Sequence, residues 1–296
     1  MSHANRLAHT NRSVYVNRLA CAPGTKEHFD QTGTCYNDKM LIKMIKSFNK
    51  LNPSDQINID QIRNESSGGE NLTQKLWKNL KSRVKDCPNE WCWLNQKFVK
   101  RIKDPKLHMF TFKPKIPKGK DTWLSTIDIE RVMDQFQEYD PTFKFLGAVP
   151  IDFETVPHYK HTFQNMNLDD LKRQGFTKIA IVLNTDPHDE PGAHWISCFI
   201  DTKLREFQFF DSLGKRAPKQ VTEWFKRLNA DQNPKYYFVW NDTPHQLENN
   251  ECGVYSLNFI IHRLLGVPFK QYVKNVHRDA QMNQQRKIIF LPAKYQ

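Results

Sequence analysis

A single cysteine near the end of the chain, Cys252, has the surroundings of a nucleophile. It follows the polar run HQLENNE and precedes an apolar segment whose spacing predicts a helix over residues 253–266. At a helix N-terminus, the unpaired backbone N–H groups and the helix dipole stabilise a thiolate, the reactive form of cysteine. A cysteine that only fills a core would have apolar neighbours on both sides. The position therefore favours thiol chemistry at Cys252.

A histidine and an aspartate have the spacing of a base and its orienting acid. His194 opens one strand-like run, and Asp211 ends the next one, 17 residues later. A hairpin with its turn near residues 202–205 would bring these strand ends together. The carboxylate would then hold one imidazole nitrogen, fix the tautomer and favour the imidazolium. We predict that His194 is the base for Cys252 and that Asp211 orients it.

The residues around Cys252 also offer donors for an oxyanion. Gln246, six residues before the cysteine, could aim its uncharged amide at the oxyanion beside the Cys252 backbone N–H. Asn249 and Asn250 are alternative donors, although asparagines here are more typical of the turn before a helix. Gly253 would let backbone or substrate approach closely. Together these residues supply every part of a thiol acyl-transfer site.

Other histidines and cysteines fit this chemistry less well. His245 has no obvious carboxylate partner, and Cys198 lies within a strand-like run where burial is expected. Cys87 and Cys92 could form half of a metal site, but no second Cys/His pair at ligand spacing accompanies them. We therefore expect no metal and no cofactor. With no apolar signal-peptide core, we expect the six cysteines to be reduced thiols.

The elements that must position these residues alternate between strand and helix patterns. The sequence predicts an α+β core over residues 119–296, with the site residues at the ends of its strands and helices. Strands are expected over residues 176–184, 194–201, 206–212 and 235–241, and helices over residues 122–139 (capped near Ser125 or Thr126), 222–230 and 253–266.

The first part of the chain is basic and mainly helical. Residues 1–118 contain 22 lysines and arginines against 10 acids, whereas residues 119–296 contain 22 of each. Amphipathic spacing predicts helices over residues 36–51, 72–84 and 90–102, and a flexible basic tail holds Arg6, Arg12 and Arg18. We interpret residues 1–104 as an arm domain, residues 105–118, with their prolines and lysines, as a linker, and residues 119–296 as a catalytic core.

Composition limits the partners. No run approaches eighteen uninterrupted apolar residues, so we expect no membrane span. In the basic arm, lysines alternate with Trp77, Trp91 and Trp93, which permits binding of nucleic acid or of an acidic scaffold. The alternative is an ordinary solvated helical face.

The site residues carry a family resemblance. The segments GAHWISCFID, FFDSLG and HQLENNECGVY resemble the cysteine peptidases that include SUMO-specific proteases and the adenovirus protease. That family shares a His-Trp pair, an acid about 17 residues on, and Gln-x5-Cys-Gly. These correspond here to His194-Trp195, Asp211 and the segment from Gln246 to Gly253. The resemblance implies a papain-like, SUMO-protease-like fold.

The start of the core is similar to one branch of this family. TWLSTIDIERVM resembles the Trp-Leu opening helix of SUMO proteases, which places Trp123 at the position that lines their substrate tunnel. Ser125 and Thr126 stand where that branch usually has Asn-Asp. The segment VLNTDPHDEPGAHWISCFID is also similar to the polyprotein-processing proteases of large DNA viruses, African swine fever virus among them. Their layout, with a helical arm ahead of the core, matches too, although the African swine fever virus enzyme has Asn at the position of Asp211.

The resemblance implies cleavage after glycine, commonly Gly-Gly, because aromatic walls narrow the tunnel. Trp195 and Trp123 are the candidate walls, although Trp123 is equally compatible with core packing. Two substrates compete: a viral structural polyprotein cleaved during virion maturation, or a ubiquitin-like modifier. A related clan transfers acetyl groups, but we identify no cofactor-activated site of that kind. We expect the enzyme in the host cytoplasm, at viral assembly sites, and in the virion, and not as a secreted protein.

Overall fold

The computed structural model describes residues 21–23, 26–65, 71–87, 90–104, 107–111, 114–117, 122–248 and 250–290. The chain divides into two compact units. We call residues 1–115 with 291–296 the helical unit and residues 116–290 the sheet unit. The basic tail with its three arginines lies outside the described residues. No helix in the described part of the chain combines the length and the apolar character that crossing a membrane requires.

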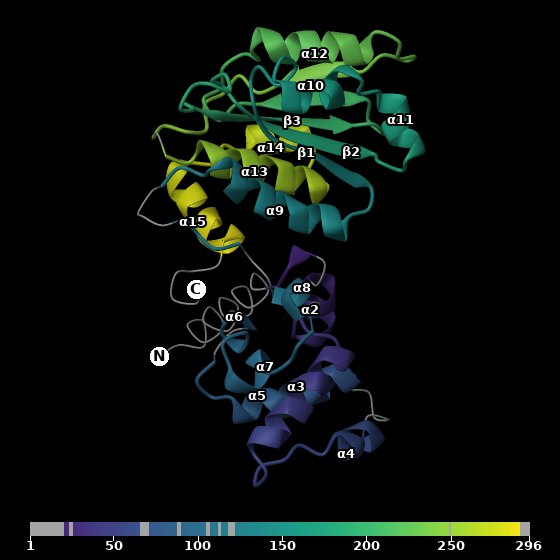
Figure 1. Ribbon diagram of the computed structural model, residues 1–296, viewed down its shortest axis with the longest axis vertical. Coiled ribbons are helices and arrows are strands. Elements are labelled where there is room, and N and C mark those ends of the chain that lie inside the picture. The colour runs from purple at the N-terminus through teal and green to yellow at the C-terminus, as the bar shows by residue number, and fades with distance from the viewer. Residues whose placement is uncertain are drawn as a thin grey trace. The chain divides into compact units, whose positions relative to one another are not determined.

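A five-stranded mixed sheet forms the centre of the sheet unit, with its strands in sequence order from edge to edge (Figure 1). The three central strands are antiparallel, and the edge strands β1 and β5 pair in parallel with β2 and β4. All four expected strands are present, and β1 was not expected. The strands are β1 (Phe143–Pro150), β2 (Lys178–Asn184), β3 (Trp195–Asp201), β4 (Glu206–Phe210) and β5 (Tyr237–Trp240).

Helices cover both faces of this sheet, and each face has its own hydrophobic core (Figure 1). The strands are nearly continuous apolar runs because both of their faces are buried. One face packs against α9 (Thr126–Tyr139), α13 (Cys252–Leu264), α14 (Phe269–Lys274) and α15 (Asp279–Ile289). The other packs against α10 (Pro157–Gln164), α11 (Leu168–Arg173) and α12 (Lys219–Asn229).

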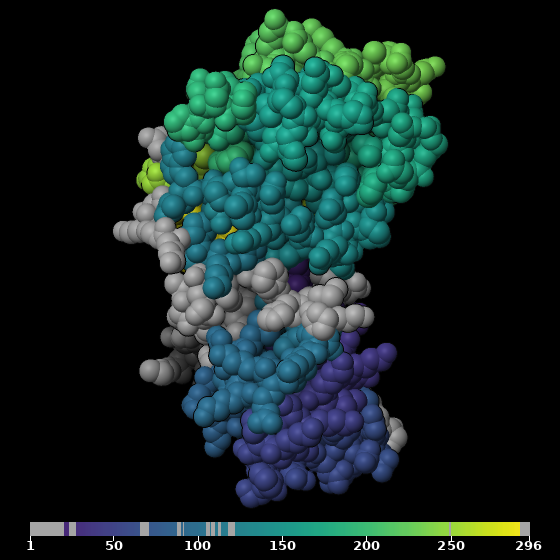
Figure 2. Space-filling view, in the orientation of Figure 1, coloured from purple at the N-terminus to yellow at the C-terminus, as the bar shows by residue number. Residues whose placement is uncertain are grey.

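Helix α13 is the central helix of the sheet unit. Its first nine residues are all buried, because apolar side chains lie around the whole circumference instead of along one stripe. In the space-filling view, teal and green residues of the preceding elements form most of the visible surface of this unit (Figure 2). Gly266, two residues past the last helical residue, adopts a φ of +81°, as is usual where a helix is closed by glycine.

The helical unit has a separate core. Its helices are α2 (Lys26–Thr32), α3 (Asp38–Leu51), α4 (Ile59–Asn64), α5 (Leu72–Arg83), α6 (Glu90–Trp93), α7 (Lys97–Lys100) and α8 (His108–Thr111). The helices expected over residues 36–51 and 72–84 are confirmed as α3 and α5. The single helix expected over residues 90–102 is wrong, because a turn at residues 94–96 separates α6 from α7.

The expectation that all six cysteines are reduced thiols is wrong for four of them. Cys21 is disulfide-bonded to Cys35, and Cys87 to Cys92, while two cysteines of the sheet unit are free. The folded chain brings the Cα atoms of the two pairs to 5.2 and 5.6 Å, a separation that a disulfide can bridge. Sequence spacing contains no information about this proximity, so the pairing was not predictable from the chain alone.

Candidate active site

The β3–β4 hairpin places the predicted base against its orienting acid. Asp201 pairs with Glu206 at the turn, and Ser197 pairs with Phe210 at the open end. His194 directly precedes β3, and Asp211 directly follows β4. His194 Nε2 therefore lies 2.7 Å from Asp211 Oδ1, as the hairpin predicted. The side chains are 14% and 4% exposed, so solvent screens this pair little.

The imidazole of His194 favours its charged form. Burial lowers its pKa, but the hydrogen bonds to Asp211 and Cys252 and the attraction of their charges outweigh burial and raise the pKa to about 9. At neutral pH the ring is therefore an imidazolium. Because Nε2 is occupied by Asp211, Nδ1 is the nitrogen left for the thiol of Cys252. This is the arrangement that a thiolate–imidazolium pair requires.

Asp211 is itself held by groups that the sequence did not reveal. Its Oδ1 also accepts a hydrogen bond from the backbone N–H of Leu213, at 2.9 Å. Asn241, directly after β5, accepts from the Asp211 backbone N–H at 2.9 Å and donates to its carbonyl at 2.7 Å. Asn241 is buried, so both bonds are shielded from water. A polar residue directly after an apolar strand was the only sequence signal for it.

Gln246 lies in the same cluster and is oriented by the residue after Asp211. Ser212 donates its hydroxyl to Gln246 Oε1 at 2.6 Å, and its carbonyl accepts from the Gln246 backbone N–H at 2.9 Å. One amide hydrogen of Gln246 is donated to the carbonyl of Glu248. Since a primary amide carries two hydrogens, a second remains for an oxyanion. Ser212 thus connects the acid to the predicted oxyanion donor.

Cys252 is the first residue of α13, as the sequence predicted. Gly253 follows it and is buried against Leu124. A Cβ built on Gly253 would lie 3.0 Å from Leu124 Cβ, so the close approach that this glycine permits is to the Leu124 side chain. Leu124 precedes Ser125, whose side chain caps α9 in a capping box with Asp128. This cap fixes the segment that packs over the cysteine helix.

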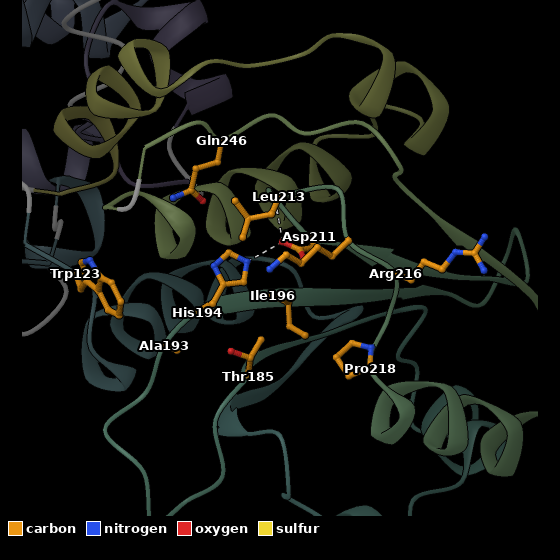
Figure 3. Close-up of a pocket in the computed structure, with 11 residues that line it drawn as sticks. Trp123, Thr185, Ala193, His194, Ile196, Asp211, Leu213, Arg216, Pro218 and Gln246 are labelled. Carbon is orange, nitrogen blue, oxygen red and sulfur yellow. Dashed lines mark hydrogen bonds and ion pairs between the residues drawn. The ribbon is translucent and has the colours of Figure 1, made fainter.

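A cavity of about 500 Å³ opens beside these groups and is lined by Trp123, His194, Asp211 and Gln246, among others. In Figure 3, the His194 ring lies between Trp123 and Asp211. Trp123 is 43% exposed, so it is a wall of the cavity and not a core residue. Trp195 is buried instead and donates its indole N–H to the Leu124 carbonyl at 2.8 Å. Trp195 therefore supports the segment that carries Trp123.

The alternative residues lie apart from this chemistry. His245 is buried, and burial lowers its pKa to about 4, so the ring is neutral. Burial also raises the pKa of the Cys198 thiol, which lies inside β3. Asn250 offers its carbonyl to an arginine, and Asn249 lies outside the described residues. The buried His245 and Cys198 are therefore structural in the folded chain.

Metal-ligating groups converge at one place in the described part of the chain. Cys21, Cys35 and Glu90 have their ligand atoms within 4.8 Å of one another. Both sulfurs are already used in the disulfide, so these residues do not form a thiolate site. Cys87 and Cys92 are bonded to each other and are likewise not thiolate ligands.

Comparison with known proteins identifies the family. Residues 121–292 match the Ulp1 protease family, C-terminal catalytic domain. The chain is 33% identical over 295 residues to a protein of Acanthamoeba polyphaga mimivirus named as a thiol protease, covering 90% of this chain and 92% of that protein. African swine fever virus proteins named as cysteine protease or SUMO-1 cysteine protease are 26% identical over 249 residues, covering 74% of this chain and 90% of theirs.

The fold agrees with this assignment. The crystal structure of an African swine fever virus protease superimposes with a TM-score of 0.59 at 19% identity, covering 93% of this chain and 96% of that one. The chain belongs to the Ulp1 protease family. It is a cysteine protease, and the resemblance seen in the sequence to viral members of this family is confirmed.

Proposed function

We propose that this cysteine protease cleaves viral structural polyproteins after glycine, at Gly-Gly-X sites, during virion maturation. Cys252 is the nucleophile, His194 the acid and base, Asp211 its orienting group and Gln246 an oxyanion donor. Trp123, with Trp195 and Gly253 behind it, shapes the channel for the glycines. The observation that carries the proposal is the half-exposed Trp123 indole on the cavity that also contains His194 and Gln246.

The geometry supports the following sequence of steps. The Cys252 thiolate attacks the carbonyl carbon of the glycine, and the charge on its oxygen is stabilised by the Cys252 backbone N–H and the Gln246 amide. The His194 imidazolium gives its proton to the leaving amine, which breaks the peptide bond and leaves a thioester. His194, now neutral, takes a proton from water, whose oxygen attacks the thioester; the C–S bond breaks, the acid is released, and the Cys252 thiolate and the His194 imidazolium are regenerated.

The position of Trp123 on the wall of the cavity supports the proposed preference for glycine. A substrate segment that reaches Cys252 past Trp123 would lie against the indole, where a larger side chain would compete with the ring for space. Trp195 donates to the Leu124 carbonyl, which holds the backbone directly after Trp123. Substrates with larger residues at this position are disfavoured, because they would have to displace the indole.

A peptide panel tests the proposal. Peptides with Gly-Gly, Gly-Ala or Ala-Ala before the cleaved bond, together with ubiquitin-like fusion proteins, are incubated with the wild type and with Cys252→Ala. We expect Gly-Gly peptides to be cut fastest and the variant to be inactive. Trp123→Ala should narrow the difference between Gly-Gly and Ala-Ala, whereas Trp240→Ala, an exposed tryptophan outside the cavity, should leave it unchanged. Cleavage by Cys252→Ala would contradict the mechanism.

A ubiquitin-like modifier is the second candidate substrate. It is favoured by the family match and by the name SUMO-1 cysteine protease given to African swine fever virus relatives. The same panel separates the two candidates, because a modifier-specific enzyme would cut folded fusions much faster than short peptides. Equal or faster cleavage of short peptides supports the polyprotein substrate.

The basic arm and the location of the enzyme complete the proposal. Trp77 and Trp93 are buried against each other, with ring centroids 4.6 Å apart, so they do not stack on bases. The side chain of Trp91 lies outside the described residues. Binding of nucleic acid or of an acidic scaffold would therefore rest on charge, and salt-sensitive retention on DNA tests it.

We propose that the enzyme is located at cytoplasmic assembly sites and in the virion. Immunogold labelling of infected cells would test this location.

A further inference from the structure

Helix α15 bonds to the middle and to the last residues of the loop that connects β5 to α13. This loop contains Gln246 and ends at Cys252, and α15 lies alongside α13 on the same face of the sheet (Figure 1). We propose that α15 is a positioning element for catalysis, in which Asp279 fixes the Gln246 end of the loop and Arg286 fixes the Cys252 end. The proposal rests on the roles given above to Gln246 and Cys252.

The first residue of α15 holds the loop directly after Gln246. Asp279 Oδ2 accepts hydrogen bonds from the backbone N–H groups of Leu247 at 2.9 Å and Glu248 at 3.2 Å. The carbonyl of Glu248 in turn accepts from the Gln246 side chain. Asp279 is 6% exposed, so water does not compete for these bonds. The direction of the Gln246 amide thus depends on a carboxylate more than thirty residues away.

Asp279 also connects this loop to the cysteine helix. Its Oδ1 accepts from the Tyr255 hydroxyl at 3.2 Å. Tyr255 lies three residues after Cys252, so both residues are on the same side of α13. The adjacent Arg278 donates to the carbonyls of Pro244 at 3.1 Å and His245 at 3.3 Å. The start of α15 therefore bonds to the loop on both sides of Gln246.

The last turn of α15 holds the residue directly before the nucleophile. Arg286 Nε lies 3.1 and 3.0 Å from the two carboxylate oxygens of Glu251, and its Nη2 lies 2.9 Å from Oε2. Nη2 also donates to the Asn250 carbonyl at 3.4 Å. Glu251 is the N-cap residue of α13, but its side chain makes no capping hydrogen bond and is used by Arg286 instead. The fork geometry fixes its direction.

The charges of this pair matter as much as its geometry. Glu251 and Arg286 are 2% and 7% exposed, and a buried ion pair is a poor source of stability. A buried carboxylate without a partner next to Cys252 would oppose formation of the thiolate. Arg286 balances the charge of that carboxylate directly next to Cys252, so the carboxylate opposes the thiolate less. The location of the pair therefore favours a role in catalysis over one in folding.

Two measurements on the full chain distinguish the role of Asp279, at the start of α15, from that of Arg286, in its last turn. Iodoacetamide alkylates Cys252 in a displacement that forms no oxyanion, whereas peptide cleavage requires both the thiolate and the oxyanion donors. Intact mass reports alkylation, with Cys252→Ala showing which signal belongs to this cysteine. Cleavage is followed with the Gly-Gly peptide through kcat and KM.

The variants predict different patterns. Asp279→Ala should lower kcat roughly tenfold, with KM and the alkylation rate within about twofold of wild type. The loop after Gln246 loses its acceptor, whereas the Tyr255 hydroxyl still has the carbonyls of His245 and His277 as acceptors. Asp279→Asn keeps an acceptor at the Oδ2 position and should restore most of kcat. Arg286→Met should lower both kcat and the alkylation rate about tenfold, and Glu251→Gln added to it should restore the alkylation rate. Lys287→Met, an exposed neighbour on the same turn, is the matched control.

The opposite patterns overturn the proposal. Equal losses of cleavage and alkylation in Asp279→Ala, or a wild-type kcat in that variant, would show that α15 only stabilises the fold. If Arg286→Met does not fold, the comparison of Asp279→Ala with Asp279→Asn decides alone. Cleavage by Cys252→Ala would instead indicate failure of the proposed function, so the two failures are distinguishable.

Discussion

In the proposed mechanism, the His194–Asp211 pair controls the proton on which turnover depends. The pKa of His194 is about 9, because the bonds and charges of Asp211 and Cys252 outweigh the effect of burial. The imidazolium is the form that protonates the leaving amine, and it is lost as the pH rises through this value. We therefore expect kcat/KM to decrease as the pH rises through about 9, which gives the pH profile an alkaline limb. Initial rates across the neutral and alkaline range measure this.

Asp211→Asn is the matched test of this assignment. An asparagine oxygen still accepts from Nε2 but carries no charge, so the pKa of His194 should fall and the alkaline limb should move to lower pH. We expect kcat to decrease less than in Asp211→Ala, because the ring keeps its orientation. An alkaline limb that stays in place in Asp211→Asn would show that another group determines it.

At the scale of elements, the turn that follows β4 connects Asp211 to the loop that contains Gln246. The turn after β4 packs against the loop before α13, and Gly214 is the point of contact. Its φ is +68°, and a Cβ there would lie 2.8 Å from the backbone atoms Pro244 N and Thr243 C. Neither backbone atom moves without shifting the loop, whose Gln246 N–H is bonded to Ser212. The glycine is therefore required for the position of Gln246.

Gly214→Ala should destabilise the protein and reduce turnover together. We expect a loss of more than about 2 kcal/mol in the free energy of unfolding, from backbone strain plus overlap, and a lower kcat. Gly266→Ala is the control, since its φ is +81° but its Cβ meets no atom within 4 Å. It should lose only about 1 kcal/mol and keep kcat. Denaturant unfolding and peptide cleavage measure both; equal effects would contradict the steric argument.

The sequence predicted those elements whose pattern is determined locally. Apolar runs identified the four strands β2 to β5, and amphipathic spacing with a Ser125 cap identified α9. Strand β1 was missed because Gly147, at a φ of +113°, interrupts its pairing between Phe145 and Ala148. Helix α15 was missed because its sequence, DAQMNQQRKII, is mostly polar and only two of its buried residues are apolar.

The site was predictable to the same extent. Three of the four predicted site residues, His194, Asp211 and Cys252, lie at the ends of elements with clear patterns, so the hairpin and the helix start could be predicted to position them. The groups that hold these residues do not have such patterns. Asn241, Asp279 and Arg286 bond to the site from elements that are far away in the sequence. No spacing rule connects Arg286 with Glu251, because the intervening turns determine where α15 lies.

At the scale of the whole molecule, the two units differ in how they are cross-linked. Both disulfides lie in the helical unit, whereas Cys198 and Cys252 of the sheet unit are free thiols. A disulfide stabilises the folded state of the unit that contains it, because it restricts the unfolded chain. Each unit also has its own hydrophobic core. Reduction should therefore act on one unit only.

Calorimetry with and without reductant measures this difference, using Cys252→Ala to avoid reaction at the nucleophile. We expect the transition of the helical unit to fall, with about 3 kcal/mol lost from the bridge between Cys21 and Cys35, which are 14 residues apart. The transition of the sheet unit should not move, and wild-type enzyme should keep its kcat in reductant. Cys21→Ser with Cys35→Ser should reproduce the lower transition without reductant. A shift of both transitions would show that the units unfold together.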